Sequence, residues 1–140
     1  MAKASYICIC CPLAKARAID STGNVSVRVF IAIEISEELR LLVKQRIEFL
    51  RLNFPNLRVG WEKPEKLHLT LKFLGEIEEN RLADLIAATE KATNEVSPFN
   101  LPIAGTGAFN KRILWLGVKD ESGNLGQINK RLENECSILG

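Results

Sequence analysis

Lys66-Leu-His-Leu-Thr-Leu-Lys-Phe-Leu-Gly75 is the most informative stretch of this sequence, and it contains the only histidine, His68. The stretch alternates in the manner of a β-strand. Because side chains two residues apart in a strand point to the same face, the imidazole of His68 and the hydroxyl of Thr70 are predicted to stand side by side, with Lys72 next to them. The intervening residues are predicted to point into a core, and Gly75 is predicted to end the strand; these core residues are Leu67, Leu69, Leu71 and Phe73.

The pair formed by His68 and Thr70 is suited to acid–base chemistry. Imidazole can carry a proton near neutral pH, and a neighbouring hydroxyl can donate a hydrogen bond to an oxyanion. A lone H-x-T triplet is also compatible with a half-buried strand histidine that is satisfied by its neighbours. The triplet alone therefore leaves both interpretations open.

The residues on either side of this strand predict the order β-α-β-β-α-β-β-α. Residues 27–35 form a strand with alternate β-branched side chains, and Ser36 is the predicted N-cap of a helix that runs to about Leu52. Short connections between adjacent strands predict antiparallel pairing, and the expected fold class is α+β, with antiparallel sheets and packed helices. The remaining elements are predicted strands at 57–61, 99–103 and 112–118, an acidic loop at 76–80, a glycine-containing loop at 105–110, and helices that begin near Leu82 and Asn124. The apolar stripes of these two helices are Leu82, Leu85, Ile86 and Thr89, and Leu125, Ile128, Leu132 and Leu139.

The length of 140 residues is enough for one domain with a sizeable core. Apolar residues make up 46% and charged residues 26%, which is typical of a soluble globular protein. The net charge of +2 does not by itself indicate nucleic-acid binding. Residues 21–24 resemble a turn-rich linker, so we expect a poorly ordered extension over 1–24 and the domain over 25–140.

The four cysteines do not form a recognisable framework. Cys8, Cys10 and Cys11 crowd near the start, and Cys136 lies in a predicted helix. No second cysteine pair or nearby histidine completes a metal site, so the pattern predicts reduced thiols in a cytoplasmic protein without a bound metal. The N-terminal apolar run is short and broken by Pro12, which favours an extension over an export signal. No stretch is long enough to span a membrane.

Three blocks of the sequence resemble one known family. These are RVFIAIEIS at 28–36, WEKPEKLHLTLKFLG at 61–75 and RILWLGV at 112–118. In this order they are similar to the RNA 2′,3′-cyclic phosphodiesterases, formerly called 2′-5′ RNA ligases, of the two-histidine phosphoesterase superfamily. The resemblance runs from about Val27 to Gly140. It implies a two-lobed fold in which two H-x-T-x motifs face each other across a cleft.

The first of these motifs matches residues 68–71, whereas the second would follow the third helix, where the sequence ends. We therefore expect the N-terminal portion of such a domain, truncated before the second motif strand. The resemblance implies hydrolysis of RNA 2′,3′-cyclic phosphate ends to a 2′-phosphomonoester, with no metal and no cofactor. His68 would be the proton donor, Thr70 a phosphate ligand, and the missing histidine the base. The implied partner is RNA, and the protein is expected to be a monomer that is inactive or very weak as this single chain.

Other residues near the motif allow two interpretations each. Arg112 is a candidate for binding a phosphate or stacking on a base, or it is an exposed arginine at a strand end. Trp61 and Phe73 can stack on a nucleobase, although aromatic side chains in strands more often belong to a core. The lysines beside the motif favour an RNA backbone or form a solvated face; they are Lys63, Lys66 and Lys72. The alternative function is a catalytically inactive module that binds an RNA end or a nucleotide.

Overall fold

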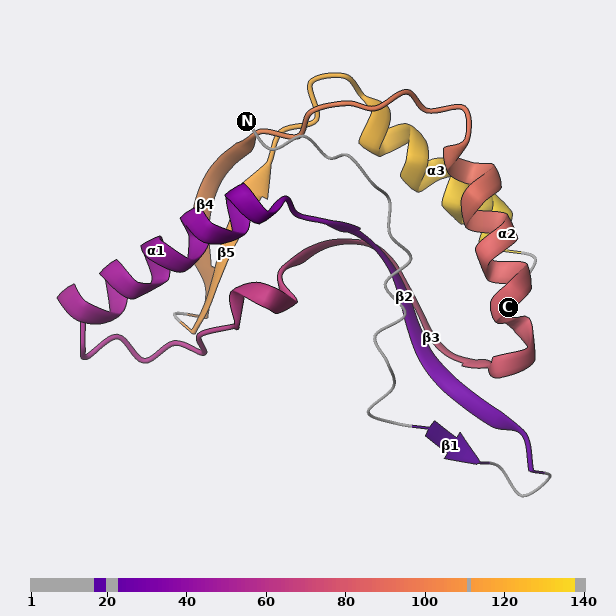
Figure 1. The fold of residues 1–140 in the computed structure, drawn as a ribbon, viewed down its shortest axis with the longest axis horizontal. Coiled ribbons are helices and arrows are strands. Elements are labelled where there is room, and N and C mark those ends of the chain that lie inside the picture. The colour runs from indigo at the N-terminus through magenta and orange to yellow at the C-terminus, as the bar shows by residue number, and fades with distance from the viewer. Residues whose placement is uncertain (1–16, 20–22, 111, 138–140) are drawn as a thin grey trace.

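The computed structural model describes residues 17–19, 23–110 and 112–137. Its described part contains a three-stranded antiparallel sheet in the order β1-β2-β3 and a separate two-stranded antiparallel sheet of β4 and β5 (Figure 1). The elements are β1 (Arg17–Ile19), β2 (Val25–Glu34), α1 (Glu37–Asn53), η1 (Pro64–Lys66), β3 (His68–Glu78), η2 (Glu79–Arg81), α2 (Leu82–Thr93), β4 (Ile103–Phe109), β5 (Ile113–Val118) and α3 (Asn124–Cys136). The α+β class and the antiparallel sheets with packed helices are confirmed.

Strands β2 and β3 form the centre of the molecule, and β3 contains two irregularities. The neighbouring β2 residues Ala32 and Ile31 pair with Thr70 and Lys72, so Leu71 between them has no partner. In the same way Phe30 and Val29 pair with Phe73 and Gly75, so Leu74 has no partner. Leu71 and Leu74 are therefore extra residues of β3, each at a β-bulge. A bulge reverses the face to which the following side chains point. Between the two bulges the faces of Lys72 and Phe73 are consequently exchanged relative to simple alternation.

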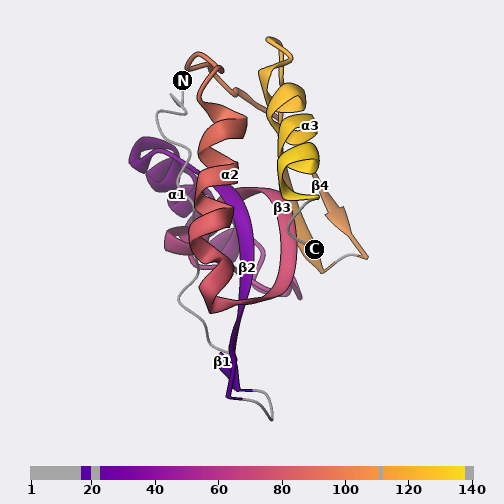
Figure 2. The same cartoon turned by 90° about the vertical axis from the view of Figure 1, so that its right-hand side faces the viewer.

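The core lies between one face of this sheet and helices α2 and α3. In Figure 2 both helices stand over the β2–β3 ribbon, and α2 and α3 pack on each other. Apolar side chains at alternate positions of β2 meet the inner faces of the two helices, and both leucines at the bulges pack against the same cluster. This core comprises Val27, Val29, Ile31, Leu85, Ala92, Ile128, Leu132 and Cys136, with Leu71, Leu74 and Ile77 partly buried beside it. The predicted buried faces of β2 and α3 are therefore confirmed in the described residues.

Helix α1 has a clear start and no buried residue. Ser36 is its N-cap, as predicted, and its Oγ accepts a hydrogen bond from the backbone N–H of Leu39 at 3.3 Å. Glu37 and Glu38 lie in the first turn, where negative charge suits the helix dipole. Leu41, Leu42, Phe49 and Leu52 are exposed. The other apolar residues of the helix are partly buried; these are Leu39, Val43, Ile47 and Leu50. The apolar stripe of α1 is thus only partly covered by the described residues.

The β4–β5 hairpin is similarly open. Most of its large side chains are exposed, among them Phe109, Ile113 and Leu116. Trp115 pairs with Gly107, and a Cβ atom at Gly107 would overlap the indole, so glycine is needed for this close approach. The hairpin and α1 overlap in Figure 1, but Figure 2 separates them on opposite sides of β2 and β3.

Several predicted boundaries were wrong. The predicted strand at 57–61 is irregular, because the chain makes turns after the Phe54 C-cap and gains no ladder partner among the described residues. Gly75 does not end β3: it adopts a φ of 76° at the second bulge, and the strand continues through the predicted acidic loop to Glu78. Ile86 lies on the exposed side of α2, whereas Leu85 and Thr89 are buried as predicted.

The glycine-containing stretch after Pro98 was also interpreted incorrectly. Residues 105–110 were predicted to be a loop, but most of them belong to β4, which begins at Ile103. The predicted strand at 99–103 is correspondingly irregular, with only a single bridge position at Asn100. Backbone pairing with β5 overrides the low strand propensity of Gly105 and Gly107.

The N-terminal segment is only partly described. Arg17–Ile19 forms β1, which pairs with Val25–Val27 of β2, inside the segment predicted to be an extension. Residues 1–16 and 20–22, with Cys8, Cys10 and Cys11, lie outside the described residues, as does Leu139 of the third predicted apolar stripe. The domain boundary at 25 stays a prediction. None of the described helices combines the length and the apolar character that crossing a bilayer requires.

Candidate active site

The imidazole of His68 is held at the first residue of β3. Its Nδ1 atom lies 2.7 Å from the backbone carbonyl oxygen of Lys66. Because a carbonyl oxygen can only accept a hydrogen bond, Nδ1 must carry the proton in this contact. The second nitrogen, Nε2, is then free of a proton when the ring is neutral and carries one only in the imidazolium form. The backbone therefore selects the tautomer of the ring and determines which nitrogen can exchange a proton with a ligand.

An aromatic side chain from the neighbouring strand fixes the plane of this imidazole. The rings of Phe30 and His68 are stacked, with centroids 4.7 Å apart and an interplanar angle of 20°. Phe30 also contacts Phe73, at a centroid distance of 5.9 Å. Phe73 as a residue is 75% exposed. These three rings form an aromatic face next to the proton-carrying group, and the prediction that Phe73 belongs to the core was wrong.

Thr70 lies on the same face as His68. Thr70 pairs with Ala32 and His68 with Glu34, and directly paired residues of antiparallel strands project to the same side of a sheet. Thr70 is partly exposed, and its hydroxyl makes no side-chain hydrogen bond within the described ranges. The hydroxyl is therefore available to a ligand that approaches His68.

Lys72, by contrast, points to the opposite face. The first bulge turns it toward α3, where its Nζ atom lies 2.7 Å from Oε1 of Glu133. The predicted row of His68, Thr70 and Lys72 is thus broken at the lysine. Lys72 holds a helix against the sheet, and it does not contribute positive charge beside the imidazole.

The remaining candidates are dispersed. Arg112 lies in the turn before β5 rather than in the strand, and its backbone carbonyl accepts a hydrogen bond from Gly60 N–H at 3.3 Å. Its side chain is exposed and has no recorded contact with His68 or Thr70 among the described residues. Trp61 is half-buried, while Lys63 and Lys66 are exposed, and Lys66 forms a long ion pair of 3.7 Å with Glu62.

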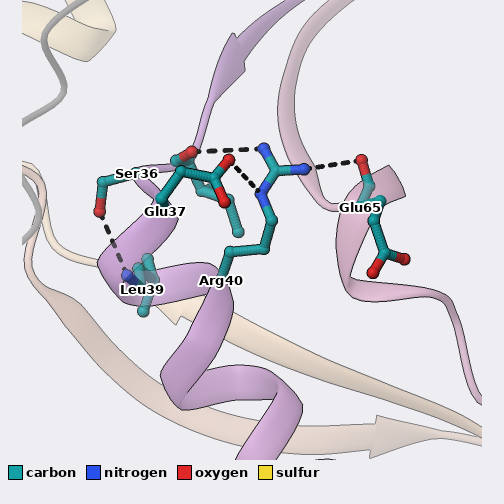
Figure 3. A network of polar contacts seen from close by, with 6 residues as sticks. Ser36, Glu37, Leu39, Arg40 and Glu65 are labelled. Atoms are coloured by element: carbon teal, nitrogen blue, oxygen red, sulfur yellow. Dashed lines mark hydrogen bonds and ion pairs between the residues drawn. The ribbon is translucent and has the colours of Figure 1, made fainter.

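Arg40 was not predicted to matter, and it joins three segments next to the site (Figure 3). Its Nη1 donates to the carbonyl of Glu65 at 2.7 Å, and its Nη2 donates to the carbonyl of Ile35 at 3.4 Å. Its buried Nε lies 3.2 Å from Oε1 of Glu37, which makes an ion pair but not a hydrogen bond. Nothing in the sequence of α1 marks Arg40, which follows Leu39 directly, as a residue next to the site. Phe30, a lone aromatic on the polar face of β2, did offer a signal.

Two pKa shifts occur in the helical layer, outside this site. Burial raises the pKa of the Cys136 thiol, with smaller opposing and reinforcing effects from Lys72 and neighbouring glutamates. Partial desolvation also raises the pKa of Asp120, but hydrogen bonds from Ser122 and from backbone N–H groups at the start of α3 outweigh it and lower that pKa overall. Both shifts belong to the structure of α3.

The arrangement can bind an anionic group and transfer one proton to or from it. His68 provides the proton-carrying nitrogen and Thr70 a hydroxyl donor, while the aromatic face can accept a flat ring. Within the described ranges, no group of three histidine, cysteine or acidic side chains is placed to hold a metal ion. A reaction that needs both an acid and a base requires a second proton-transfer group, since His68 is the only histidine.

One family model and several curated proteins match this sequence. The family model described as LigT like Phosphoesterase matches residues 33–115, which include β3 and both sheets' longest strands. RNA 2′,3′-cyclic phosphodiesterases from Archaeoglobus fulgidus, Methanothermobacter thermautotrophicus and Thermotoga maritima are 34%, 32% and 31% identical to it. These alignments cover 81%, 83% and 81% of this chain, but 63%, 64% and 61% of the relatives.

The chain therefore spans a little over three-fifths of the length of these curated relatives. No solved structure gives a significant match to it. The family match covers more than half of the chain and includes the strand that carries His68 and Thr70. On this evidence the chain belongs to the LigT-like phosphoesterase family.

Proposed function

We propose that this chain supplies the acid half of an active site that hydrolyses RNA 2′,3′-cyclic phosphate ends. The observation that carries the proposal is the hydrogen bond between His68 Nδ1 and Lys66, which leaves Nε2 as the exchanging nitrogen on the face of Thr70. The curated relatives are named RNA 2′,3′-cyclic phosphodiesterases, which supports the same reaction here.

In the proposed reaction water attacks phosphorus and the bond from phosphorus to the ribose 3′ oxygen breaks. The imidazolium of His68 donates its Nε2 proton to that departing oxygen, and a base takes a proton from the water. Thr70 donates a hydrogen bond to a non-bridging phosphate oxygen, where negative charge increases in the transition state. The product is a 2′-phosphomonoester. Neither proton transfer uses a metal ion.

The aromatic face supports RNA as the partner. Phe73 is exposed next to the stacked Phe30 and His68, and unpaired bases of RNA commonly stack on such rings. Arg112 is kept as a candidate phosphate ligand, although its place in the β4–β5 turn gives it no direct contact with the pair. We also propose a monomeric cytoplasmic protein with its domain over residues 25–140 and an extension before it.

The test is hydrolysis of an oligonucleotide with a 2′,3′-cyclic phosphate end in the presence of a chelator. The 140-residue chain lacks a second histidine, so its rate is expected to fall about a hundred- to ten-thousandfold below that of a chain extended with a second H-x-T strand. In the extended chain His68→Ala should abolish activity, and Thr70→Ala should lower it about ten- to a hundredfold. Full activity of the single chain, with His68→Ala unaffected, would contradict the proposal.

The second candidate is a binding module for an RNA end or a nucleotide. It is favoured by the combination of an exposed aromatic face with only one imidazole. A titration of the 140-residue chain with a 2′,3′-cyclic nucleotide, followed through the ring signals of its single histidine, measures binding without turnover. Tight binding together with an inactive extended chain would favour this candidate over the enzyme.

A further inference from the structure

We propose that Arg40 is a positioning residue for His68: it holds η1 against the end of β2, and η1 in turn holds the imidazole. A side chain of α1 thus helps to determine which ring nitrogen of His68 carries the proton. Its functional meaning rests on the proposed role of His68, but its structural content can be tested without any activity.

The first step is the connection from Arg40 to η1. Only 17% of the Arg40 side chain is exposed, and its guanidinium binds two backbone carbonyls from segments 30 residues apart in sequence, those of Ile35 and Glu65. The planar guanidinium can bind both carbonyls because its donors diverge in a fixed geometry. Both carbonyls lie outside the sheet ladders, so they have unused acceptor capacity.

The second step is the connection from η1 to the imidazole. At this short helix the N–H of Lys66 donates to the carbonyl oxygen of Lys63 at 2.9 Å, and the N–H of Leu67 donates to the carbonyl oxygen of Pro64 at 3.2 Å. These bonds and the fixed φ of Pro64 make η1 a stiff unit. The carbonyl of Glu65 is bound by Arg40, and the next carbonyl along the chain, that of Lys66, accepts from Nδ1 of His68. A displacement of Glu65 therefore displaces the acceptor on which the tautomer depends.

The third step is the contact between Arg40 and the end of β2. Ile35 directly follows Glu34, which is the strand partner of His68 in β2. Arg40 thus ties the segment before His68 to the residue after its pairing partner. Glu37 lies beside the guanidinium Nε and balances its charge, since a mostly buried cation without a counter-charge would be costly.

The chain allows a direct test, because it contains one histidine and therefore one set of imidazole ring signals. The protein is labelled with ¹⁵N-histidine, and the tautomer is measured by NMR at a pH where the ring is neutral. In the unsubstituted protein we expect the form protonated at Nδ1. In Arg40→Met and Arg40→Gln we expect a mixture with the form protonated at Nε2, which free imidazole side chains prefer.

Arg40→Gln is the milder variant, because its amide is polar but too short to reach Glu65. If Arg40→Met does not fold, the tautomer in Arg40→Gln tests the inference. Arg46→Gln is the matched control, because Arg46 lies on the same helix, over the exposed ring of Phe49 at 5.1 Å. The control should retain the Nδ1 form. A folded Arg40 variant with an unchanged tautomer would overturn the inference.

Activity separates this inference from the proposed function. In the extended chain with two H-x-T strands, Arg40→Gln should lower kcat by about ten- to a hundredfold with little change in KM, because a misplaced acid affects the chemical step more than binding. A changed tautomer with unchanged kcat would leave the positioning role intact and would instead argue against His68 as the acid.

Discussion

The β2–β3 sheet with α2 and α3 is a closed core, whereas α1 and the β4–β5 hairpin bury none of their large apolar side chains fully and expose many of them. Ile31 and Leu132 are fully buried in the first region, while Leu52 and Phe109 are exposed in the second. Both regions have amphipathic elements of ordinary length. The difference is that β2 and β3 have a helical layer opposite their apolar face, and the described part of the chain places no such layer on α1 or the hairpin.

This comparison teaches that an apolar stripe contributes to stability only when a second layer removes it from water. The first region should therefore determine the free energy of unfolding of the chain. Residues of α1 and the hairpin should contribute mainly through local structure.

The largest expected effect comes from truncating a leucine in each region. Leu132→Ala removes a side chain that is 0% exposed, and it should lower the free energy of unfolding by about 2–5 kcal/mol. Leu52→Ala on α1, where the side chain is 81% exposed, should change it by less than about 0.5 kcal/mol. Urea denaturation of both variants measures this difference. Equal losses would show that α1 is packed as well as α3.

A smaller effect is expected from the ion pair that joins α3 to β3. Glu133→Gln leaves Lys72, which is only 19% exposed, without its 2.7 Å partner and should cost up to about 1 kcal/mol. Glu121→Gln breaks the exposed pair with Lys119, at 2.8 Å, and should cost close to nothing. The comparison is made by denaturation at low and high salt. A larger loss for Glu121→Gln would reverse the assignment of Lys72 to the packed layer.

The smallest effect concerns the start of α3, where Asp120 Oδ2 accepts from Gly126 N–H at 3.0 Å. Because the pKa of Asp120 is lowered on folding, its ionised form stabilises the folded state above the ordinary aspartate pKa, and this contribution is lost as the pH falls through the lowered value. Asp120→Asn should therefore lower the Tm at neutral pH, with a difference that narrows below about pH 4.

The control for this pH dependence is Ser36→Ala, which removes the uncharged cap of α1. Ser36→Ala should lower the Tm by the same amount at neutral pH and below about pH 4. A loss for Asp120→Asn that is also independent of pH would show that the carboxylate charge of Asp120 contributes nothing.

Much of this architecture could be predicted from the sequence because it depends on local patterns. The strand at 27–35, the Ser36 cap and the apolar face of α3 follow from periodicity and capping chemistry. The pairing of His68 with Thr70 on one face follows from their spacing in the strand. The faces of Lys72 and Phe73 could not be predicted, because the bulges depend on pairing with β2, which lies 40 residues earlier in the chain.

The network around Arg40 was missed for a related reason. Arginine on an amphipathic helix is usually solvated, and nothing within α1 indicates that two distant carbonyls converge on it. Likewise, β4 forms from a glycine-containing stretch because β5 offers a ladder, which is a tertiary effect rather than a propensity. Contacts between distant segments were thus the part that sequence patterns could not provide.

The two bulges of β3 behave like a pair of compensating frameshifts. Leu71 shifts the frame in which side chains are assigned to faces, and Leu74 shifts it back. Residues 68–71 and 75–78 consequently keep the faces of an unbroken strand, while the three residues 72–74 are inverted. Because neither leucine has a ladder partner, deleting both would leave the pairing with β2 in register: Lys72 would stay opposite Ile31, and Phe73 opposite Phe30. A regular strand could therefore present the same two faces. The two extra residues add leucine side chains to the core rather than choosing which residues reach the site.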